Sequence, residues 1–472
     1  MPTLRTSSFT IGSGGVCSLP PSGWDAGTDT GTLVGNVWTP ARGASGKVTA
    51  ASVALIPLST SSNVQWVEVA GTRLDGLDSV VKGVQPGWSS LGSGDPWNSV
   101  LSNYSGAAWD VRAGTERAFV AVSGGHFGGS NDGTYSVDFR RMSWSVEQHP
   151  ADQSGFDTAY KIPDIYTSTN SFTNYTLSSS YYGSNQTNSE GVYNDEFFDP
   201  AFPTSPTRSP RRPTARHQYC ALVFVPELGA AGRLISGTRR YWEYDIATRA
   251  WLAPKFPFGV QSGYGGDTTG YSGQYCAGFW HSSSGRYFFG PTQGNVVNGG
   301  HVFWSSTTGG ANWVNEGYFP FGGNESEFVA WQQRGDTVWG LVFNPSGNQT
   351  TRPYQMREIN LGTRATVAHA ITLGASLSGK TWPTNDYDFG PGMTWVPWIS
   401  KWLCNLRTVE NGYAWAWLDP ATWTIDLVTE FSGAAVANPA QTMLNKIMGF
   451  EAAGLLTHIH VGDQNLRVAR FA

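Results

Sequence analysis

Short runs of aromatic and β-branched residues dominate this chain, and Gly, Asn, Asp or Ser closes nearly every run. Apolar residues rarely recur at the three- and four-residue spacing of an amphipathic helix, and Gly or Pro interrupts most windows of helical length. This pattern predicts an all-β protein made of many short strands.

The runs come in groups, and the groups repeat. The segment from His217 to Gly229 (HQYCALVFVPELG) matches the segment from Gly273 to Gly285 (GQYCAGFWHSSSG), and a second strand follows each. In several groups a Trp opens the fourth run. Four strands in a unit of about 50 residues are typical of one blade of a β-propeller, whose innermost strands line a central channel. The residues that mark the first strand of successive units lie 53 to 66 positions apart: Tyr219, Tyr275, Phe328, Thr394 and Ile447.

The two ends of the chain complement each other in this scheme. Residues 446–472 supply only three strands, and Asn63–Ala70 stands alone near the front as a Trp-bearing fourth strand. We therefore expect the segment around Trp66 to lie beside Leu466–Phe471 in one sheet, which closes the ring and leaves no open sheet edge at the seam. The prediction is a single propeller of six blades, with seven blades as the alternative.

Two segments lie outside the repeat. Residues 1–60 are expected to form an N-terminal extension with a strand at Ser52–Leu58, with an anchor or part of a seventh blade as the alternatives, and residues 61–472 form the propeller. Within the propeller, residues 150–213 are a long inserted loop rich in Ser, Thr, Asn, Tyr and Pro. Loops this long are often functional, and the many aromatic residues favour a loop packed on the propeller over a free tail.

Glycines, a Tyr–Asp pair and a Trp recur in two of the units. They are Gly124, Gly125, Tyr135, Asp138 and Trp144 in one unit, and Gly237, Tyr244, Asp245 and Trp251 in the other. Over residues 100–147 and 216–256 this arrangement resembles a kelch repeat. The resemblance implies a kelch-type propeller such as the central domain of galactose oxidase. Kelch motifs specify a fold far better than an activity.

The net charge and the length of the apolar runs argue against two classes of partner, nucleic acid and the membrane interior. The chain has 472 residues and a formal net charge of −5, and charged residues make up 14% of it, where about 25% is typical. The mild acidic excess argues against nucleic acid, which needs a concentrated basic face. No apolar run reaches the 18 or more residues of a membrane-spanning helix, so we expect no membrane span.

The surface composition predicts where the protein works. The first ten residues contain one Arg and no apolar stretch, so they do not form a classical secretory signal. A surface rich in Ser, Thr, Asn, Gly and aromatic residues is nevertheless typical of a protein that works outside a cell. We therefore expect a virion or extracellular setting without a classical signal peptide, and otherwise a cytoplasmic one.

One face of the ring is expected to gather polar side chains, because the ends of second strands, the starts of third strands and the entries to the next first strand meet there. His, Arg, Tyr and carboxylate side chains from different blades predict a concave ligand-binding site on this face. The candidate ligand-binding residues are His126, Arg216, His217, Tyr219, Arg239, Arg240, His301, Asp386, Tyr387, Asp388 and Arg407. For each of them, a rim residue that hydrogen-bonds a turn is the competing interpretation.

Metal and cofactor signals are weak. His458-x-His460 puts two imidazoles on one strand face, and His126, His217 and His301 are further conceivable ligands. No spacing among them is diagnostic of a metal site. A galactose-oxidase-like copper centre finds no residue-by-residue match in this chain. We expect neither a metal nor another cofactor.

Signals for nucleophilic chemistry are weaker still. The chain has no G-x-S-x-G motif. Cys220 and Cys276 occupy equivalent first-strand positions among apolar residues, which favours buried and unreactive thiols. Asp386 and Asp388 form the kind of carboxylate pair that a glycosidase uses, although such pairs are common in turns.

Aromatic residues in expected loops favour a binding role. The chain has 21 Trp residues, and blade packing accounts for about half of them. Flat aromatic faces bind sugar rings, and burial against another subunit would use the same residues. The Trp residues beside Gly or Pro in expected loops are Trp24, Trp88, Trp97 and Trp382.

Three functional hypotheses follow. The first is a non-catalytic recognition or structural propeller that binds a glycan or a protein, as an assembly subunit such as a tail or capsid-associated component of a phage virion. The second is a polysaccharide lyase, in which Arg216 or Arg239 would neutralise a uronate carboxylate and His217 or Tyr219 would move the proton. The third is a metal-dependent oxidase. The balance of these signals is against catalysis.

Overall fold

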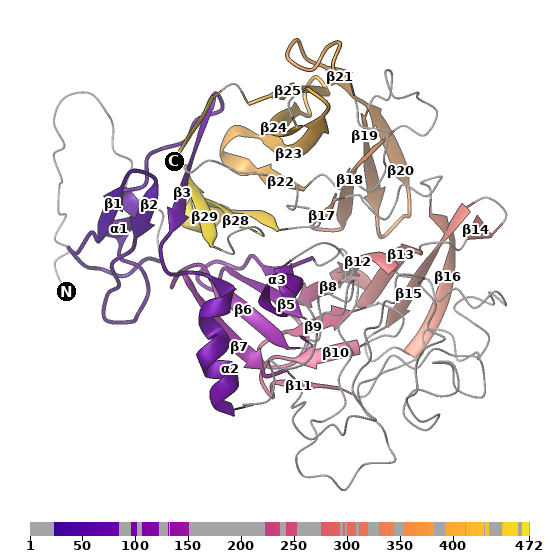
Figure 1. Ribbon diagram of the computed structural model, residues 1–472. Helices are drawn as coiled ribbons and strands as arrows, with labels where there is room; N and C mark the ends of the chain where they lie inside the picture. The colour runs from indigo at the N-terminus through magenta and orange to yellow at the C-terminus, as the bar shows by residue number, and fades with distance from the viewer. Residues whose placement is uncertain are drawn as a thin grey trace, which may run out of the picture.

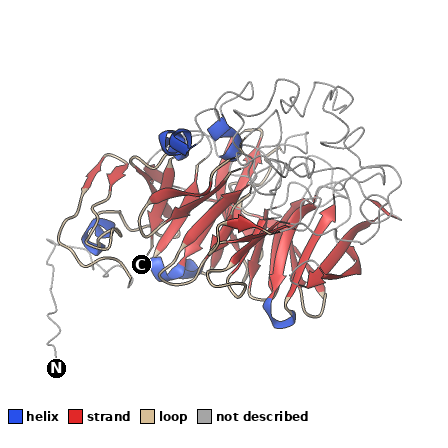
Figure 2. Cartoon of the chain, turned by 90° about the horizontal axis from the view of Figure 1, so that it is seen from below, coloured by secondary structure: helices blue, strands red, loops and turns tan. Residues whose placement is uncertain are grey.

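The computed structural model is an all-β propeller, as predicted (Figure 1). Its described residues form six sheets arranged in a ring. Figure 2 shows that strands make up the body and that the short helices lie at its margins. No helix among the described residues combines the length and the apolar character needed to cross a membrane. The structure describes residues 23–84, 96–101, 106–121, 131, 133–150, 222–236, 242–252, 275–292, 296–297, 300–307, 311–319, 330–343, 354–381, 392–410, 412–428, 430–433, 446–460 and 465–471.

Five of the sheets are each built from strands that are consecutive in the chain, and we call them blades 1 to 5. Blade 1 contains β4 (Ala108–Asp110), β5 (Arg117–Ala121), β6 (Thr134–Asp138) and β7 (Ser143–Gln148). Blade 2 contains β8 (Leu222–Val225), β9 (Arg233–Ser236), β10 (Trp242–Asp245) and β11 (Ala250–Trp251). Blade 3 contains β12 (Tyr275–His281), β13 (Arg286–Thr292), β14 (Val296–Val297), β15 (Gly300–Thr307) and β16 (Ala311–Phe319).

Blades 4 and 5 continue the ring. Blade 4 contains β17 (Ala330–Arg334), β18 (Thr337–Phe343), β19 (Tyr354–Asn360) and β20 (Thr366–Ala370). Blade 5 contains β22 (Met393–Val396), β23 (Lys401–Thr408), β24 (Gly412–Asp419) and β25 (Thr424–Leu427), and β21 (Thr372–Leu373) pairs with β25 in parallel.

The remaining sheet joins the two ends of the chain, and we call it the closure sheet. Its strands are β27 (Ile447–Phe450), β28 (Leu455–Ile459), β29 (Leu466–Arg470), β3 (Asn63–Val69), β2 (Val37–Thr39), β1 (Thr32–Val34) and β26 (Glu430–Gly433). β29 and β3 are antiparallel, with Val468 opposite Val67 and Ala469 opposite Trp66. The predicted pairing of the Trp66 segment with Leu466–Phe471 is confirmed. The prediction of six blades is wrong: the ring has five blades of consecutive strands, and this composite sheet closes it.

Both halves of the outer edge of β3 are covered. β26 pairs in parallel with Asn63–Trp66, and β2 pairs in parallel with Glu68 and Val69. An open edge would leave a row of unpaired N–H and C=O groups available to another chain. The strand that closes the ring is therefore paired on both sides.

The N-terminal extension contains a helix where a strand was expected. α1 (Ala50–Ala54) begins after Thr49, whose hydroxyl accepts a hydrogen bond from the Ser52 N–H at 3.1 Å. This N-cap and the good helix formers in AASVA favour a helical turn. The expectation of a strand at Ser52–Leu58 is wrong, and Leu58 makes only an isolated bridge to Arg470.

Two further helices and a 3₁₀ turn follow β3. They are η1 (Leu74–Leu77), α2 (Asp78–Val84) and α3 (Pro96–Leu101). Trp97 on α3 is 3% exposed; its ring lies 5.4 Å from that of Tyr135, and its Nε1 donates to Asp78 Oδ1 at 3.1 Å. The interpretation of Trp97 as an aromatic residue in a loop is therefore wrong, because it belongs to the core.

In three sheets the turn after the innermost strand has the same form. These 3₁₀ turns are η6 (Ser282–Ser284) in blade 3, η10 (Pro397–Ile399) in blade 5 and η12 (Glu451–Ala453) in the closure sheet. A residue in the left-handed region ends each of them: Gly285, Ser400 and Gly454. The repeat of the sequence is thus a repeat of backbone conformation.

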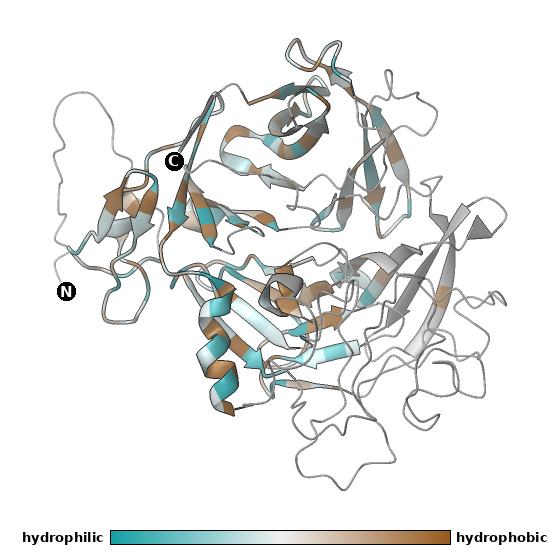
Figure 3. Cartoon of the chain, viewed as in Figure 1, coloured by the Kyte–Doolittle hydropathy of each residue, from teal (hydrophilic) through white to brown (hydrophobic). Residues whose placement is uncertain are grey.

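The core lies between neighbouring sheets. Figure 3 shows polar and apolar residues alternating along outer strands such as β3. The central strands β28 and β29 are instead buried at every position, because a sheet packs against each of their faces. Between blade 5 and the closure sheet, the rings of Trp66 and Trp415 lie 6.0 Å apart among buried residues such as Leu403.

A buried ion pair ties the N-terminal extension to the ring. Arg140 donates to both carboxylate oxygens of Glu116, at 2.7 and 2.5 Å, and to the carbonyl of Ala452 at 3.2 Å. Its guanidinium lies 4.3 Å from the ring of Trp24, and its own carbonyl accepts from the Val48 N–H at 2.7 Å. One side chain thereby joins blade 1, the closure sheet and the extension.

Replacing Trp66 by Ala should lower the free energy of unfolding by about 3–5 kcal/mol, because it empties a buried site at the seam of the ring. Val80→Ala, at an exposed position of α2, should change it by less than about 0.5 kcal/mol. Urea denaturation followed by tryptophan fluorescence and circular dichroism measures both. Equal midpoints for the two variants would contradict the role given to Trp66.

Candidate functional site

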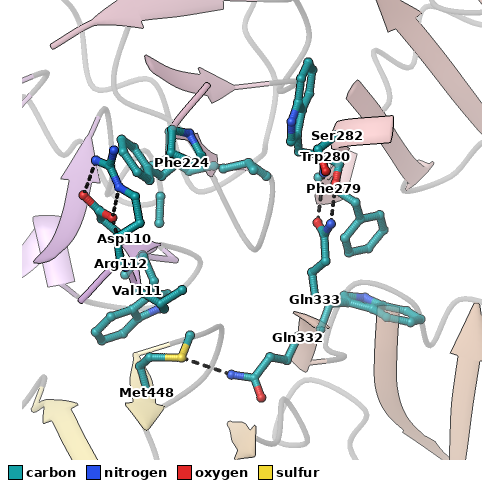
Figure 4. A pocket seen from close by; sticks show the side chains of 18 of the residues that line it. Asp110, Val111, Arg112, Phe224, Phe279, Trp280, Ser282, Gln332, Gln333 and Met448 are labelled. Atoms are coloured by element: carbon teal, nitrogen blue, oxygen red, sulfur yellow. Dashed lines mark hydrogen bonds and ion pairs between the residues drawn. The ribbon is translucent and has the colours of Figure 1, made fainter. Parts of the chain in front are cut away.

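The innermost strands line the central channel, as the sequence predicted, and enclose a cavity of about 360 Å³ (Figure 4). Strands β4, β8, β12 and β17 contribute most of the lining, and Met448 comes from β27. Val111, Glu227 and Ser282 belong to turns that follow innermost strands. The cavity therefore lies at the channel end where these turns meet, opposite the face on which the sequence placed a site.

Aromatic rings form much of the wall. Trp109, Phe224 and Trp280 come from three different blades and line the cavity. Phe224 stacks on Phe119 with 5.5 Å between ring centroids, and Trp109 stacks on Phe139 at 5.9 Å. These contacts with the core hold the rings in place, so the wall is preformed.

An ion pair stands at the mouth of the cavity. Arg112 Nε and a terminal guanidinium nitrogen donate to the two carboxylate oxygens of Asp110, each at 2.8 Å. Asp110 is buried, whereas the Arg112 side chain is 45% exposed and its guanidinium lies 5.2 Å from the Phe224 ring. The hydrogen bond to Asp110 raises the pKa of Arg112, so this group stays cationic. The pair offers polar contacts to a ligand while its two charges compensate each other.

Two adjacent glutamines of β17 link the inner strands of neighbouring blades. The Gln333 amide accepts from the Trp280 N–H at 2.9 Å and donates to the Trp280 carbonyl. Gln332 accepts from the Trp395 N–H at 2.6 Å and donates to Thr394 Oγ1 at 3.0 Å. Successive side chains of a strand point to opposite faces, so one amide reaches blade 3 and the other blade 5.

These amides serve a backbone requirement of the propeller. An innermost strand has a neighbouring strand on one side only, and the N–H and C=O groups along its other edge need partners when they are buried. The Thr394 hydroxyl continues the arrangement by accepting from the Gly449 N–H of the closure sheet at 3.2 Å. Figure 4 shows Gln332 extending towards Met448, whose sulfur lies 3.3 Å from the amide nitrogen. Side chains thereby replace strand pairing along part of the channel.

Most of the predicted ligand-binding residues lie outside the described residues. This holds for His126, Arg216, His217, Tyr219, Arg239, Arg240, Asp386, Tyr387 and Asp388. The backbone of His301 is in β15, opposite Val296 and Phe319, and that of Arg407 is in β23, opposite Tyr413. A binding site on their face of the ring stays a prediction.

The His458-x-His460 pair is part of the packing. His458 is buried, with its ring 6.0 Å from Trp66, 5.8 Å from Trp415 and 5.6 Å from His460. Among the described residues, no three His, Cys, Asp or Glu side chains come together as metal ligands.

One cysteine is described with its side chain. Cys404 on β23 is a fully buried free thiol, and burial raises its pKa. A thiol in this environment stays protonated and is a poor nucleophile. Cys220 lies outside the described residues, and the structure describes only the backbone of Cys276; the prediction that both are unreactive remains a prediction.

Sequence reasoning missed the residues that shape the cavity. Gln332 and Gln333 interrupt an apolar first strand (EFVAWQQ), and two adjacent amides in such a strand are the signal that would have found them. Asp110 ends β4 and Arg112 follows two residues later, and neither was among the candidate site residues. The partners of the two glutamines belong to other blades, and spacing along the chain does not disclose those contacts.

The chain matches no family model and no curated protein. Among solved structures, an α-L-arabinanase from Penicillium chrysogenum complexed with arabinobiose aligns over 78% of this chain and 97% of its own, at 10% identity and a TM-score of 0.36. A GH74 xyloglucanase from Xanthomonas campestris aligns over 71% of this chain and 39% of its own, at 11% identity and a TM-score of 0.34. A chain of a mitotic checkpoint complex aligns over 79% of this chain and 92% of its own, at 11% identity and a TM-score of 0.35. Likenesses this weak are evidence for neither a ligand nor an activity.

Replacing Gln333 by Leu should speed hydrogen exchange at the Trp280 amide, and Gln332→Leu should do so at the Trp395 amide, because each variant removes the acceptor of that N–H. Loss of one such partner costs about 1–3 kcal/mol. Amide hydrogen exchange is measured by mass spectrometry on both variants, and each variant serves as the control for the other. The same amides accelerating in both variants would contradict these separate roles.

Proposed function

We propose that this protein is a recognition propeller that binds a saccharide in the channel-end cavity. The observation that carries the proposal is the combination of aromatic rings, amides and a compensated ion pair around one cavity of about 360 Å³. This volume is within the roughly 300–1,000 Å³ of small-molecule sites, which pair apolar walls with a few placed polar groups. Sugar rings present apolar C–H faces to aromatic walls and hydroxyls to amides and charged groups.

The charges favour a neutral saccharide over an acidic one. Asp110 compensates the charge of Arg112, and Glu227 adds an exposed carboxylate to the lining. Asp110 also contacts Arg117 at 3.8 Å, but Arg117 does not line the cavity, so a uronate carboxylate entering it would meet two carboxylates and one cation. The low proportion of charged residues in the whole chain fits a neutral glycan as well.

The proposal also covers the repeat family and the assembly in which the protein works. A kelch-type repeat is supported by the recurring Gly, Tyr–Asp and Trp positions of the sequence. A role as an assembly subunit in a virion or another extracellular particle is supported by the composition of the chain. A protein ligand in place of the saccharide would leave every glycan in the binding experiment below unbound.

A bulky side chain at the cavity mouth should prevent binding. Val111 lines the cavity and is 56% exposed, so Val111→Trp would fill its entrance without disturbing the core. On an array of neutral and acidic glycans, we expect the wild type to bind neutral saccharides and the variant to bind them at least about tenfold more weakly.

The matched control is Val367→Trp, since Val367 is exposed on β20, at the outer edge of blade 4. This variant should bind like the wild type. Absence of binding to every glycan, or equal binding by the Val111→Trp and wild-type proteins, would overturn the proposal. Binding to acidic glycans alone would contradict the assignment of a neutral ligand.

A further inference from the structure

A serine, a histidine and an aspartate contact one another in sequence on two turns that adjoin the cavity. Ser284 Oγ is 2.6 Å from His281 Nδ1, and the other nitrogen of that ring, Nε2, is 3.3 Å from Asp336 Oδ2. His281 and Ser284 belong to the turn after β12, whereas Asp336 belongs to the turn after β17 of the next blade. A hydroxyl bonded to an imidazole that a carboxylate orients in turn is the arrangement of an activated nucleophile.

The fold does not require these polar side chains. η6, η10 and η12 follow His281, Val396 and Phe450, whose backbones nearly coincide: φ and ψ are −105° and 98°, −112° and 97°, and −99° and 95°. The position of Ser284 is held by Ile399 in η10 and by Ala453 in η12. Two apolar pairs therefore build the same turn, and only blade 3 of these three sheets places a His and a Ser there.

Neighbouring residues hold the imidazole of His281 in place and leave Ser284 accessible to solvent. His281 is 7% exposed, and its ring meets Phe288 edge-on at 6.3 Å. Gly362 of blade 4 lies so close that a Cβ there would come within 3.3 Å of His281 Nε2. Ser283 donates to Asp336 Oδ2 at 3.0 Å and fixes the carboxylate, while Ser284 itself is exposed. A buried base next to an exposed hydroxyl suits attack on a substrate that arrives from solvent.

We propose that Ser284 is the nucleophile of a carboxylic ester hydrolase, with His281 as its general base and Asp336 as the positioning residue. A neutral His281 that carries its proton on Nε2 turns that N–H towards the Asp336 carboxylate, 3.3 Å away, and accepts the Ser284 proton on Nδ1. This use of the two ring nitrogens is the reverse of the order in the serine proteases, but both nitrogens are competent bases.

The reaction balances without a cofactor. Ser284 Oγ attacks the ester carbonyl carbon as its proton passes to His281 Nδ1; the C–O bond to the alcohol then breaks, and the alcohol leaves with that proton. Water attacks the acyl-serine, gives a proton to His281 and releases the carboxylic acid, and the proton returns to Ser284 Oγ. The sum is ester plus water to acid plus alcohol.

The position of the cluster indicates the substrate class. Ser282 and Gly335, which adjoin the cluster on its two turns, both line the cavity. Ser284 does not line the cavity itself, so an O-acyl group on a saccharide held there would reach Ser284 by extending past Ser282 and Gly335. We therefore assign O-acylated neutral saccharides as the substrates, an assignment that rests on the proposed function, whereas the activated serine rests on its own geometry.

Two measurements on the full chain test this activity. A fluorophosphonate, which labels activated serines covalently, should modify Ser284 as mapped by tandem mass spectrometry. The wild type should also release acetate from an acetylated neutral polysaccharide such as acetylated xylan. Ser284→Ala and His281→Phe should each lose labelling and acetate release by at least about 100-fold.

These two variants should keep their fold, because Ala453 and Phe450 hold the same positions in the closure sheet. Their Tm should shift by less than about 3 °C. Ser62→Ala, at an exposed serine far along the chain from the cluster, is the control and should react like the wild type.

The outcomes separate this inference from the proposed function. A wild type that takes no label at Ser284 and releases no acetate overturns the ester hydrolase, whatever the glycan array reports. Labelling of Ser284 without binding of any saccharide supports the activated serine and overturns the saccharide assignment. Label or acetate release that persists in Ser284→Ala overturns the role of this serine.

Discussion

The pairing of β3 with β29 is the constraint on which the rest of the structure depends. A ring of sheets stays closed only if its first and last elements meet, and here seven residues from the front of the chain complete a sheet whose other inner strands come from the end. Trp66 of β3 packs at the interface between the closure sheet and blade 5, where its ring lies 6.0 Å from that of Trp415. On the other side, Arg140, which is paired with Glu116, joins blade 1 to the closure sheet by donating a hydrogen bond to the Ala452 carbonyl. Because both edges of β3 are paired, this strand offers no free edge to another chain.

Closure brings the innermost strands together and so creates the channel. Their inward edges have no neighbouring strand, and Gln332, Gln333 and Thr394 satisfy part of that edge with side-chain hydrogen bonds. Where the turns after these strands meet, aromatic rings and the Asp110–Arg112 pair enclose the cavity that we assign to a saccharide. The same geometry places a turn of blade 3 against a turn of blade 4, and it is this contact that lines up Ser284, His281 and Asp336. The proposed saccharide site and the proposed nucleophile thus both depend on the closure of one ring.

The sequence was sufficient for the all-β propeller and its repeating units of four strands, because alternation, turn residues and repeat length are local properties. The sequence also predicted which segments close the ring. The C-terminal unit has only three strands, and the segment Asn63–Ala70 near the N-terminus was the one match for its missing fourth strand. It failed at Ser52–Leu58, where the Thr49 cap decided in favour of a helix. It failed again at the cavity: Gln332 and Gln333 are adjacent in sequence but bind different blades, and the partner of His281 lies one blade further along the chain. Such contacts depend on which turns become neighbours, and a repeat pattern without coordinates does not specify this.

Disulfide cross-linking across the seam tests the closure most directly. Val67 and Val468 are opposite each other in antiparallel strands, where Cα atoms lie roughly 4.5–5.5 Å apart, within the range that a disulfide spans. The Val67→Cys/Val468→Cys protein should form an intramolecular disulfide on mild oxidation, identified as one cross-linked peptide by mass spectrometry. The Val67→Cys/Ala469→Cys protein is one residue out of register, with side chains on opposite faces, and should stay reduced at these positions. A missing bond in the first protein, or equal bond formation in both, would contradict the closure of the ring by β3 and β29.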